Sequence, residues 1–460
     1  MSIVERLKRK IDTVLVDWKN TPDHMPLIIK GARQIGKSFI IREVGKQIYP
    51  NFIELNFVED DEGPQLLKNI HSTEEFYLRL SAMSGIELGS YADTLIFLDE
   101  IQHYPQYLTL LKFFRQEHKF RFIASGSLLG ITLKKTTSIP VGSLILKRMY
   151  QLDFEEWLIA NGFGEDALRY LKECYDKRAS LSEDMHQYVL SLFQRYLLVG
   201  GLPDVVNEYL NSRNIAKVRE VQEAIIELYK EDAAKYEQEV ERKLHILRIY
   251  DMISSQMENK KKRVVAKKIQ DKKGDRFENY SEEFEYLVSS GIALAVNAIS
   301  NPHYPLTESV HKNLLKLYHN DVGLLTAKLY GLSIKAILET EKSVNLGSVY
   351  ESVVPQELAA HGHPLFYYDN KAKGEVDYIV DDSDKCRVLP VEVKSGKDYR
   401  VHSALNTMVS DPEYRIDEAV VLSNEREVML KKKVLYMPVY FVMFLKAREP
   451  QEMTEEELLF

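Results

Sequence analysis

Short apolar runs alternate with amphipathic segments over the first 150 residues. The runs cover residues 25–30, 94–98 and 120–124, and a helical pattern follows the first of them. Apolar residues also recur at helical spacing over residues 1–20, without the apolar block and cleavage site of a signal peptide. Because strands that alternate with helices are typical of a parallel sheet, we expect an α/β domain over residues 1–150.

The pattern changes three times further along the chain. Residues 151–245 are helical in period, with glycine breaks at 161–162 and 200–203, and they predict a helical lid. Residues 246–325 hold two helical stretches and then an apolar strand, an order typical of a winged helix. Residues 326–460 form a last α/β domain, in which polar and apolar positions alternate over 375–380 and 388–394 around a polar turn. This alternation predicts a β-hairpin.

The first apolar run leads into a glycine-rich loop with the spacing GxxxxGKS, and the helical pattern follows it. A chance glycine turn would not need this order of strand, loop and helix, but a phosphate-binding P-loop, or Walker A motif, requires it. Backbone N–H groups of such a loop surround phosphate oxygens, its lysine contacts the β- and γ-phosphates, and its hydroxyl binds Mg²⁺. The expected ATP-binding residues are Gly31, Ala32, Arg33, Gln34, Ile35, Gly36, Lys37 and Ser38.

An acidic pair ends the second apolar run, as in a Walker B motif. We expect Asp99 to hold Mg²⁺ together with Ser38, and Glu100 to activate the attacking water. Without the P-loop upstream, a helix N-cap would be the simpler interpretation of the pair. Ser125 ends the third run, and two interpretations of it stay open: a contact to the γ-phosphate or the attacking water, and a plain strand-to-helix turn.

Composition and charge limit the remaining choices. A chain of 460 residues has room for about three domains. Its two cysteines, Cys174 and Cys386, are too few for a disulfide framework or a CxxC zinc site, and the longest apolar runs are too short to span a bilayer. We therefore expect a cytoplasmic protein. The net charge of −8 means that a nucleic-acid partner would need a local basic patch.

One such patch lies between residues 260 and 276. It would neutralise DNA phosphates, although charge runs are more often solvated helix faces, and the acids of the next helix argue against docking into a groove. Contact with a protein and internal scaffolding are the alternatives. The basic residues are Lys260, Lys261, Lys262, Arg263, Lys267, Lys268, Lys272, Lys273 and Arg276, and the following acids are Glu278, Glu282, Glu283 and Glu285.

The predicted C-terminal hairpin carries chemistry on one face. Glu392 and Lys394 share a side of their strand because side chains alternate, and pairing with the preceding strand can place Asp377 beside them. Two carboxylates can hold Mg²⁺ against a substrate phosphate while the lysine orients water, so the pattern is typical of metal-dependent nucleases. Cross-strand ion pairs on an exposed face are the alternative.

Together these motifs resemble a prokaryotic AAA-type ATPase family whose C-terminal domain is related to the PD-(D/E)xK restriction-endonuclease fold. The resemblance implies ATP as nucleotide, an AAA-like sheet with a helical lid, and Glu351 as a third metal ligand in the nuclease-like domain. Gly142-Ser143 departs from the family's Gly-Arg, so the arginine finger stays unassigned, with Arg33 and Arg148 as candidates. The quoted motifs are Asp99-Glu100-Ile101-Gln102, Tyr104-Pro105, Ser125-Gly126-Ser127, Phe154-Glu155-Glu156-Trp157-Leu158 and Gly200-Gly201-Leu202-Pro203.

Two functions agree with these expectations. The first is an ATP phosphohydrolase, using Lys37 and Glu100, whose nucleotide state controls a nuclease-like domain that acts on DNA through Asp377, Glu392 and Lys394. The second is a switch without nuclease activity that docks a protein partner on its C-terminal domain. Mg²⁺ is the expected metal in both domains, and a second copy of the chain is a further candidate partner.

Overall fold

We describe a computed structural model of the chain, in which residues 6–22, 25–56, 70, 72–85, 88, 93–104, 106–127, 129, 142–236, 239–257, 262–270, 276–338, 346–382, 386–396 and 398–447 are described. Parts of the basic patch, namely Lys260, Lys261, Lys272 and Lys273, lie outside the described residues, as does Pro105.

A five-stranded parallel sheet organises the N-terminal region, in the order β2-β3-β4-β1-β5. Every residue of β3 is buried, and α2 covers the sheet with apolar residues three and four positions apart. The expected α/β architecture of this region is confirmed. Its elements are α1 (Lys10–Asn20), β1 (Leu27–Lys30), α2 (Lys37–Ile48), β2 (Asn51–Asn56), α4 (Thr73–Ser84), β3 (Thr94–Asp99), η1 (Ile101–His103), α5 (Gln106–Glu117), β4 (Arg121–Gly126) and β5 (Ile145–Arg148).

Helices follow this sheet, as the periodicity predicted. They are α7 (Phe154–Ala160), α8 (Glu165–Asp176), α9 (Glu183–Val199), α10 (Pro203–Ser212), α11 (Ile215–Tyr236) and α12 (Val240–Met257). Pro203 is suited to the start of α10 because the first helical N–H has no intrahelical partner. Among the described residues, no single helix is long and apolar enough to cross a membrane; α9 and α10 pass this test only as a pair, and they are bent by 120°.

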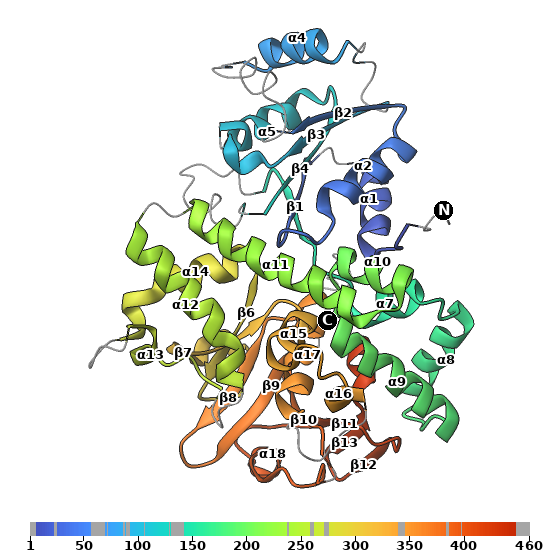
Figure 1. Cartoon of the computed structure of the whole chain (residues 1–460), viewed down its shortest axis with the longest axis vertical. Helices are drawn as coiled ribbons and strands as arrows, with labels where there is room; N and C mark the ends of the chain where they lie inside the picture. Colours follow the sequence, from blue (N-terminus) through green and yellow to red (C-terminus); the bar gives the residue numbers. More distant parts are fainter. Residues whose placement is uncertain are drawn as a thin grey trace, which may run out of the picture.

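An eight-stranded mixed sheet forms the other half of the molecule, below the first sheet in Figure 1, in the order β12-β13-β11-β10-β9-β8-β6-β7. Its strands are β6 (Ala293–Ile299), β7 (Val310–His319), β8 (Phe366–Asn370), β9 (Gly374–Asp382), β10 (Arg387–Lys394), β11 (Ala419–Ser423), β12 (Met429–Lys431) and β13 (Val434–Pro438). The helical elements around it are α13 (Lys267–Gln270), η2 (Phe277–Tyr280), α14 (Ser281–Ser289), η3 (Leu306–Ser309), α15 (Val322–Tyr330), α16 (Lys335–Leu338), α17 (Gly347–Ala360), α18 (Ser403–Ser410) and η4 (Val439–Phe444).

The strands expected in a winged-helix module belong to this same sheet. β6 pairs with β7 in an antiparallel hairpin, and its other edge pairs in parallel with β8. Five of the seven residues of β6 are buried, so its backbone groups need partners on both edges. The expected boundary after residue 325 therefore does not separate two sheets. The winged-helix and nuclease-like assignments stay predictions.

Helix α17 lies at the centre of the molecule and is buried on all sides. Twelve consecutive residues, 348–359, are buried, and one continuous apolar core reaches from α1 through the lid helices to η4. A helix that is surrounded in this way contacts several elements at once. The two halves are thus packed together through a shared interior.

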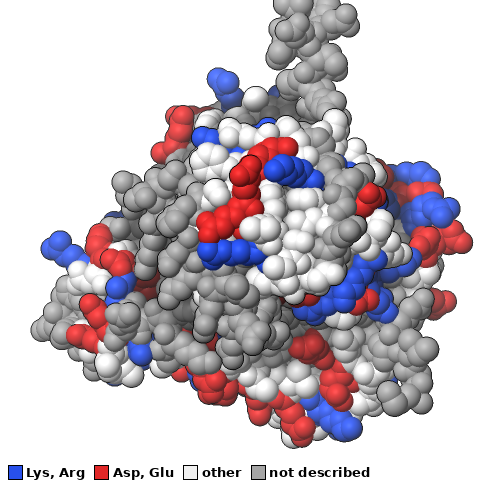
Figure 2. Space-filling view, turned by 90° about the horizontal axis from the view of Figure 1, so that it is seen from above, with Lys and Arg blue, Asp and Glu red and all other residues white. Residues whose placement is uncertain are grey.

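The described outer surface of the N-terminal end is mixed in charge. Seen from the end that carries α4, basic and acidic side chains lie interspersed between uncharged ones (Figure 2). This view agrees with a chain whose net charge of −8 does not come from one block of acids.

Candidate nucleotide site and acid pocket

The expected P-loop connects β1 to α2 at the carboxyl edge of the parallel sheet. Gly36 precedes α2 with a φ of 87°, a left-handed conformation in which a side chain would be strained. Lys37 is only 7% exposed, and its ammonium group donates to the carbonyl oxygens of Gly31 at 3.0 Å and Ala32 at 2.7 Å. Burial lowers the pKa of Lys37 to about 8, although Glu100 and Asp99 attract its charge.

Asp99 lies where the sequence predicted it, at the end of β3 and close to the loop. Its carboxylate accepts hydrogen bonds from the hydroxyl groups of Ser125 and Ser38 and, at 3.0 Å, from the backbone N–H of Glu100. Burial raises the pKa of Asp99 in spite of these bonds. A hydroxyl and a carboxylate oxygen side by side fit the oxygen ligands that Mg²⁺ prefers, so Ser38 and Asp99 are suited to hold it. Ser125 contacts this aspartate, a role that neither sequence interpretation included.

The position of Glu100 depends on Gln102. Glu100 has a φ of 53°, and its carboxylate accepts a hydrogen bond from the Gln102 side-chain amide. The same amide lies against Gly126, where a Cβ atom would come within 2.1 Å of its oxygen. Gly126 therefore leaves the space in which Gln102 holds Glu100. The sequence did not indicate this contact, because it depends on how η1 packs against β4.

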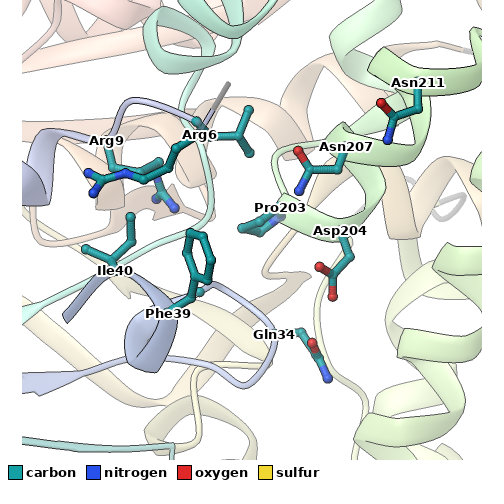
Figure 3. A pocket seen from close by; sticks show the side chains of 11 residues that line it. Arg6, Arg9, Gln34, Phe39, Ile40, Pro203, Asp204, Asn207 and Asn211 are labelled. Atoms are coloured by element: carbon teal, nitrogen blue, oxygen red, sulfur yellow. The ribbon is translucent and has the colours of Figure 1, made fainter. Parts of the chain in front are cut away.

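A cavity of about 450 Å³ adjoins the P-loop, and the sequence did not predict it. In Figure 3, the Phe39 and Ile40 side chains of α2 lie on one side of the cavity, and those of Asn207 and Asn211 from α10 lie opposite. Three segments that are distant in sequence form its wall, so no local motif marks it. The lining residues are Arg6, Leu7, Arg9, Gln34, Gly36, Phe39, Ile40, Pro203, Asp204, Asn207 and Asn211.

The two candidate arginine fingers contact other parts of this chain. Arg33 forms an ion pair with Asp232 of α11, and its carbonyl accepts a hydrogen bond from the Tyr229 hydroxyl at 3.0 Å. Arg148 donates to the Val288 carbonyl at 3.4 Å. The P-loop is therefore tied to the lid through Arg33, and the assignment of an arginine finger stays open.

A second group of candidate residues comes together on β9, β10 and α17. β9 and β10 pair as the antiparallel hairpin that the alternation predicted, and the Asp377 carboxylate accepts a hydrogen bond from the Val393 N–H at 2.9 Å. Glu392 forms an ion pair with Lys394 at 2.8 Å. Glu351 reaches the same place from α17. The cavity here, about 330 Å³ in volume, is called the acid pocket below and is lined by Lys262, Gly347, Glu351, Glu375, Asp377, Val393, Lys394, Ser395 and Gly396.

Lysines pair with the acids of the acid pocket. Glu351 pairs with Lys262 and, at 3.3 Å, with Lys316, and it accepts a hydrogen bond from the Tyr318 hydroxyl at 2.8 Å. Burial alone would raise the pKa of Glu351, but Lys316 and Lys262 lower it to about 2. Within the described residues, no three His, Cys, Asp or Glu side chains are placed to hold a metal ion. In this arrangement the pocket does not fit Mg²⁺.

Two residues of the basic patch, Lys262 and Arg263, face inward, whereas Lys268 and Arg276 are exposed. Lys262 pairs with Glu351, and Arg263 pairs with Asp369 and, at 3.3 Å, with Glu375. The side chains of both basic residues are only 18% exposed. These two residues therefore act as internal counter-ions, which agrees with the alternative of internal scaffolding for this part of the patch, and DNA binding by the patch stays a prediction.

The acids of the presumed recognition helix also have partners within the chain. Glu282 pairs with Arg242, and Glu283 lies 3.3 Å from a ring nitrogen of His245 on α12. Both contacts follow from the packing of α14 on α12.

Parts of this chain match three protein families. Residues 23–158 match the family described as AAA domain. The N-terminal region is therefore similar to AAA-type P-loop ATPase domains. Residues 190–335 and 346–442 match two families described as domains of unknown function, DUF8612 and DUF4143. A search among curated proteins found no match.

Several solved structures are similar to this chain at low identity. The Walker-type ATPase PABY2304 of Pyrococcus abyssi is 13% identical with a TM-score of 0.44, and the match covers 70% of this chain and 96% of that one. The Aeropyrum pernix ORC1 protein, solved in complex with DNA, is 12% identical with a TM-score of 0.32, over 74% and 94% of the two chains. The Thermotoga maritima RuvB Holliday junction branch migration motor is 12% identical with a TM-score of 0.28, over 63% and 89%.

Replacing Glu100 by Gln should separate ATP binding from ATP hydrolysis. The substitution keeps the shape of the side chain and the expected metal ligand Asp99 but removes the carboxylate that is expected to act as the base, so we expect kcat to fall by at least about 100-fold, with ATP affinity within about threefold of wild type. Steady-state phosphate release and equilibrium titration with ATP measure the two quantities. The exposed Glu165→Gln serves as the control, and normal turnover in Glu100→Gln would remove Glu100 from catalysis.

ATP affinity should fall as the pH rises through the pKa of Lys37. The lysine is charged below about pH 8 in the free protein, and bound phosphate favours the charged form, so binding above that pH must take up a proton. We expect Kd to rise about tenfold per pH unit above pH 8. Lys37→Arg is the control, because its guanidinium stays charged and its affinity should not vary over this range. A pH-independent Kd in the wild type would contradict the assigned role.

Proposed function

We propose that this protein is an ATP hydrolase whose nucleotide state controls its C-terminal, nuclease-like domain, with DNA as the substrate of that domain. The observation that carries the proposal is the position of α17. This helix presents Glu351 to the acid pocket, and six residues later Glu357 contacts the start of α7, beside the ATPase domain. A single helix thus contacts both the acid pocket and the start of α7.

The described site offers a contact for each part of ATP. Its phosphates belong on the P-loop, where Lys37 exchanges the loop carbonyls for phosphate oxygens, and its base belongs in the cavity between α2 and α10. Mg²⁺, held by Ser38 and Asp99, would neutralise phosphate charge in the transition state. Glu100 then takes the proton of the attacking water.

A series of buried polar contacts leads from the P-loop to α7. The Arg9 guanidinium donates to the carbonyl of Ile35 in the loop at 3.2 Å and pairs with Glu156 at 3.1 Å. Asp153, in the same capping box as Glu156, pairs with Lys10. A displacement of the P-loop by bound phosphate therefore acts directly on the start of α7.

The contacts continue from α7 to α17. Asp153 lies 3.4 Å from the His361 ring, just beyond α17, and the backbone N–H of Phe154 donates to both oxygens of Glu357, at 3.1 and 3.3 Å. The Tyr196 hydroxyl of α9 also donates to Glu357, at 2.9 Å. Burial and the charge of Asp153 raise the pKa of Glu357 well above its ordinary value. An unpaired carboxyl group in a protein interior costs free energy. We therefore expect a displacement of the start of α7 to displace Glu357 and α17 with it.

A second candidate function, a switch that docks a protein partner, is favoured by the lysines in the acid pocket. A pocket in which Lys262 and Lys316 neutralise Glu351 is closed to Mg²⁺, and such a domain would act through its surface alone. Both candidates use the same ATPase and the same helix. They differ in whether the acid pocket ever performs chemistry.

DNA cleavage with and without ATP distinguishes the two functions. We expect the wild type to cleave single- or double-stranded DNA in Mg²⁺ or Mn²⁺ in an ATP-dependent manner, and Glu392→Ala to lose at least about 100-fold of that activity because a metal ligand is gone. The control Glu418→Ala removes a partly exposed acid elsewhere in the same domain. Absence of cleavage in the wild type with ATPase activity intact would reject the nuclease function and favour the switch.

Hydrogen–deuterium exchange tests the role of α17 directly. In the Glu100→Gln variant, which we expect to retain bound ATP, nucleotide binding should change the hydrogen–deuterium exchange rate of the backbone amides of residues 347–360. Adding Tyr196→Phe removes the hydroxyl that bonds Glu357 and should reduce that change by at least about half, since contact with α9 is weakened. Tyr188→Phe on the same helix is the matched control, because this ring is 54% exposed. An unchanged response in the Tyr196 variant would exclude this contact from the coupling.

A further inference from the structure

A turn of the eight-stranded sheet lies directly against the P-loop. This turn, residues 290–292 between α14 and β6, is called the β6 turn below, and its Gly291 is buried with a φ of 81°. A Cβ atom on Gly291 would lie 3.0 Å from the backbone nitrogen of Ala32 and 3.3 Å from its Cα atom. Glycine therefore lets these two backbones approach more closely than a residue with a side chain would.

The P-loop is held from outside at three consecutive residues. Gly31 packs so closely against Met149, just after β5, that a Cβ atom would come within 2.3 Å of the Met149 carbonyl oxygen. The carbonyl of Arg33 accepts a hydrogen bond from the Tyr229 hydroxyl of α11 at 3.0 Å. The β6 turn supplies the contact at the residue between them, Ala32. The backbone path of the loop is thus set by three segments that are distant in sequence.

The position of Ala32 matters for Lys37. The Ala32 carbonyl accepts a hydrogen bond from the Lys37 ammonium group at 2.7 Å, the shorter of the two bonds that hold this group. Because Lys37 is expected to contact the β- and γ-phosphates, a shift of Ala32 would move a phosphate ligand. The cavity between the P-loop and the β6 turn measures only about 10 Å³, roughly the volume needed for one water molecule. An added atom at Gly291 would therefore press on the loop.

The β6 turn is itself fixed by backbone hydrogen bonds. The N–H of Gly291 donates to the carbonyl of Val288 at 3.1 Å, and the N–H of Asn320 donates to the carbonyl of Ile292 at 3.3 Å. The side chain of Asn320 also donates to the Tyr229 hydroxyl at 3.3 Å. The contacts to Ala32 and to Arg33 thus share one support. Since a turn with satisfied backbone groups resists displacement, we expect the P-loop to yield first.

We propose that Gly291 is a positioning residue for the P-loop, one that sets the place of Ala32 and thereby directs the Lys37 ammonium group toward ATP. β6 belongs to the same sheet as β9 and β10, so this contact makes the second half of the molecule a part of the nucleotide site. It is separate from the contacts through α7 and α17. The proposal rests on the proposed function in taking ATP as the ligand.

Equilibrium titration with ATP tests the proposal in full-length protein that carries Glu100→Gln, in which hydrolysis is expected to be slow. The titration compares Gly291→Ala with Gly162→Ala. Gly162 has a φ of 82° and no described atom within 4 Å of its Cβ position, so both substitutions strain the backbone alike, but only Gly291→Ala presses on the P-loop. We expect the Kd for ATP to rise at least about tenfold in Gly291→Ala and to stay within about twofold in Gly162→Ala.

The pH dependence of ATP binding distinguishes positioning from a loss of stability. Moving the Ala32 carbonyl away from Lys37 removes an acceptor that favours the charged ammonium group, so it lowers the pKa of Lys37. The Kd is expected to rise above about pH 8 with Gly291 in place, and in Gly291→Ala this rise should begin at a lower pH. Gly162→Ala should keep the original profile. A merely destabilised fold would unfold at a lower temperature without changing the profile.

A second variant and a second measurement keep the test decisive if Gly291→Ala does not fold. Asparagine tolerates a left-handed backbone, and its Cβ atom meets the same atoms of Ala32, so Gly291→Asn should weaken ATP binding as well. With Gly291 in place, ATP should change the hydrogen–deuterium exchange rate of residues 290–293 and leave that of residues 161–163 unchanged. Equal affinities in the Gly291 and Gly162 variants, or no ATP-dependent change at residues 290–293, would overturn the proposal.

Failure of this proposal and failure of the proposed function give different results. A protein that does not bind ATP with Gly291 in place would reject the proposed function and the role of Gly291 with it. A protein that binds ATP equally well in the Gly291 and Gly162 variants would reject the role of Gly291 alone. Absence of DNA cleavage would leave the ATP titration unchanged.

Discussion

Asp153 and Glu156 are buried acids at the start of α7, and the rest of the structure depends on pairing them. Their partners come from distant segments: Arg9 and Lys10 from the N-terminal end, and His361 from the end of α17. Burial raises the pKa of a carboxyl group, but Lys10 and His361 lower the pKa of Asp153 below its ordinary value. An isolated carboxylate in this place would cost several kcal/mol, so the ATPase domain and the C-terminal domain must meet here.

The nucleotide site is built to keep its charges satisfied before a ligand arrives. Lys37 bonds to two carbonyls of its own loop, and Asp99 is held by the hydroxyls of Ser38 and Ser125. Replacing these internal bonds by phosphate and metal contacts changes the loop that also contacts Arg9 and, through Arg33, α11. The same bonds that prepare the site for ATP therefore connect it to the lid and to α7.

In the acid pocket, lysines neutralise the charge of buried carboxylates in the absence of a ligand. Glu351 lies on α17, the helix that also reaches α7, so any movement of that helix alters its distance from Lys262 and Lys316. Lys316 is fixed by the sheet, whereas Lys262 is on an extended segment. The proposed control of the pocket by nucleotide depends on this geometry.

Local patterns in the sequence determined the parts of each site that one or two neighbouring elements build. The P-loop, Asp99 at the end of its strand, and the hairpin that brings Asp377 to Glu392 follow from glycine spacing and from side-chain alternation, which act over a few residues. Only the tertiary structure decided that Gln102 holds Glu100, that α2 and α10 enclose a cavity, and that Lys262 and Lys316 pair with Glu351. These contacts join residues that share no periodic pattern, because the packing of the whole core selects which buried charges and apolar faces meet.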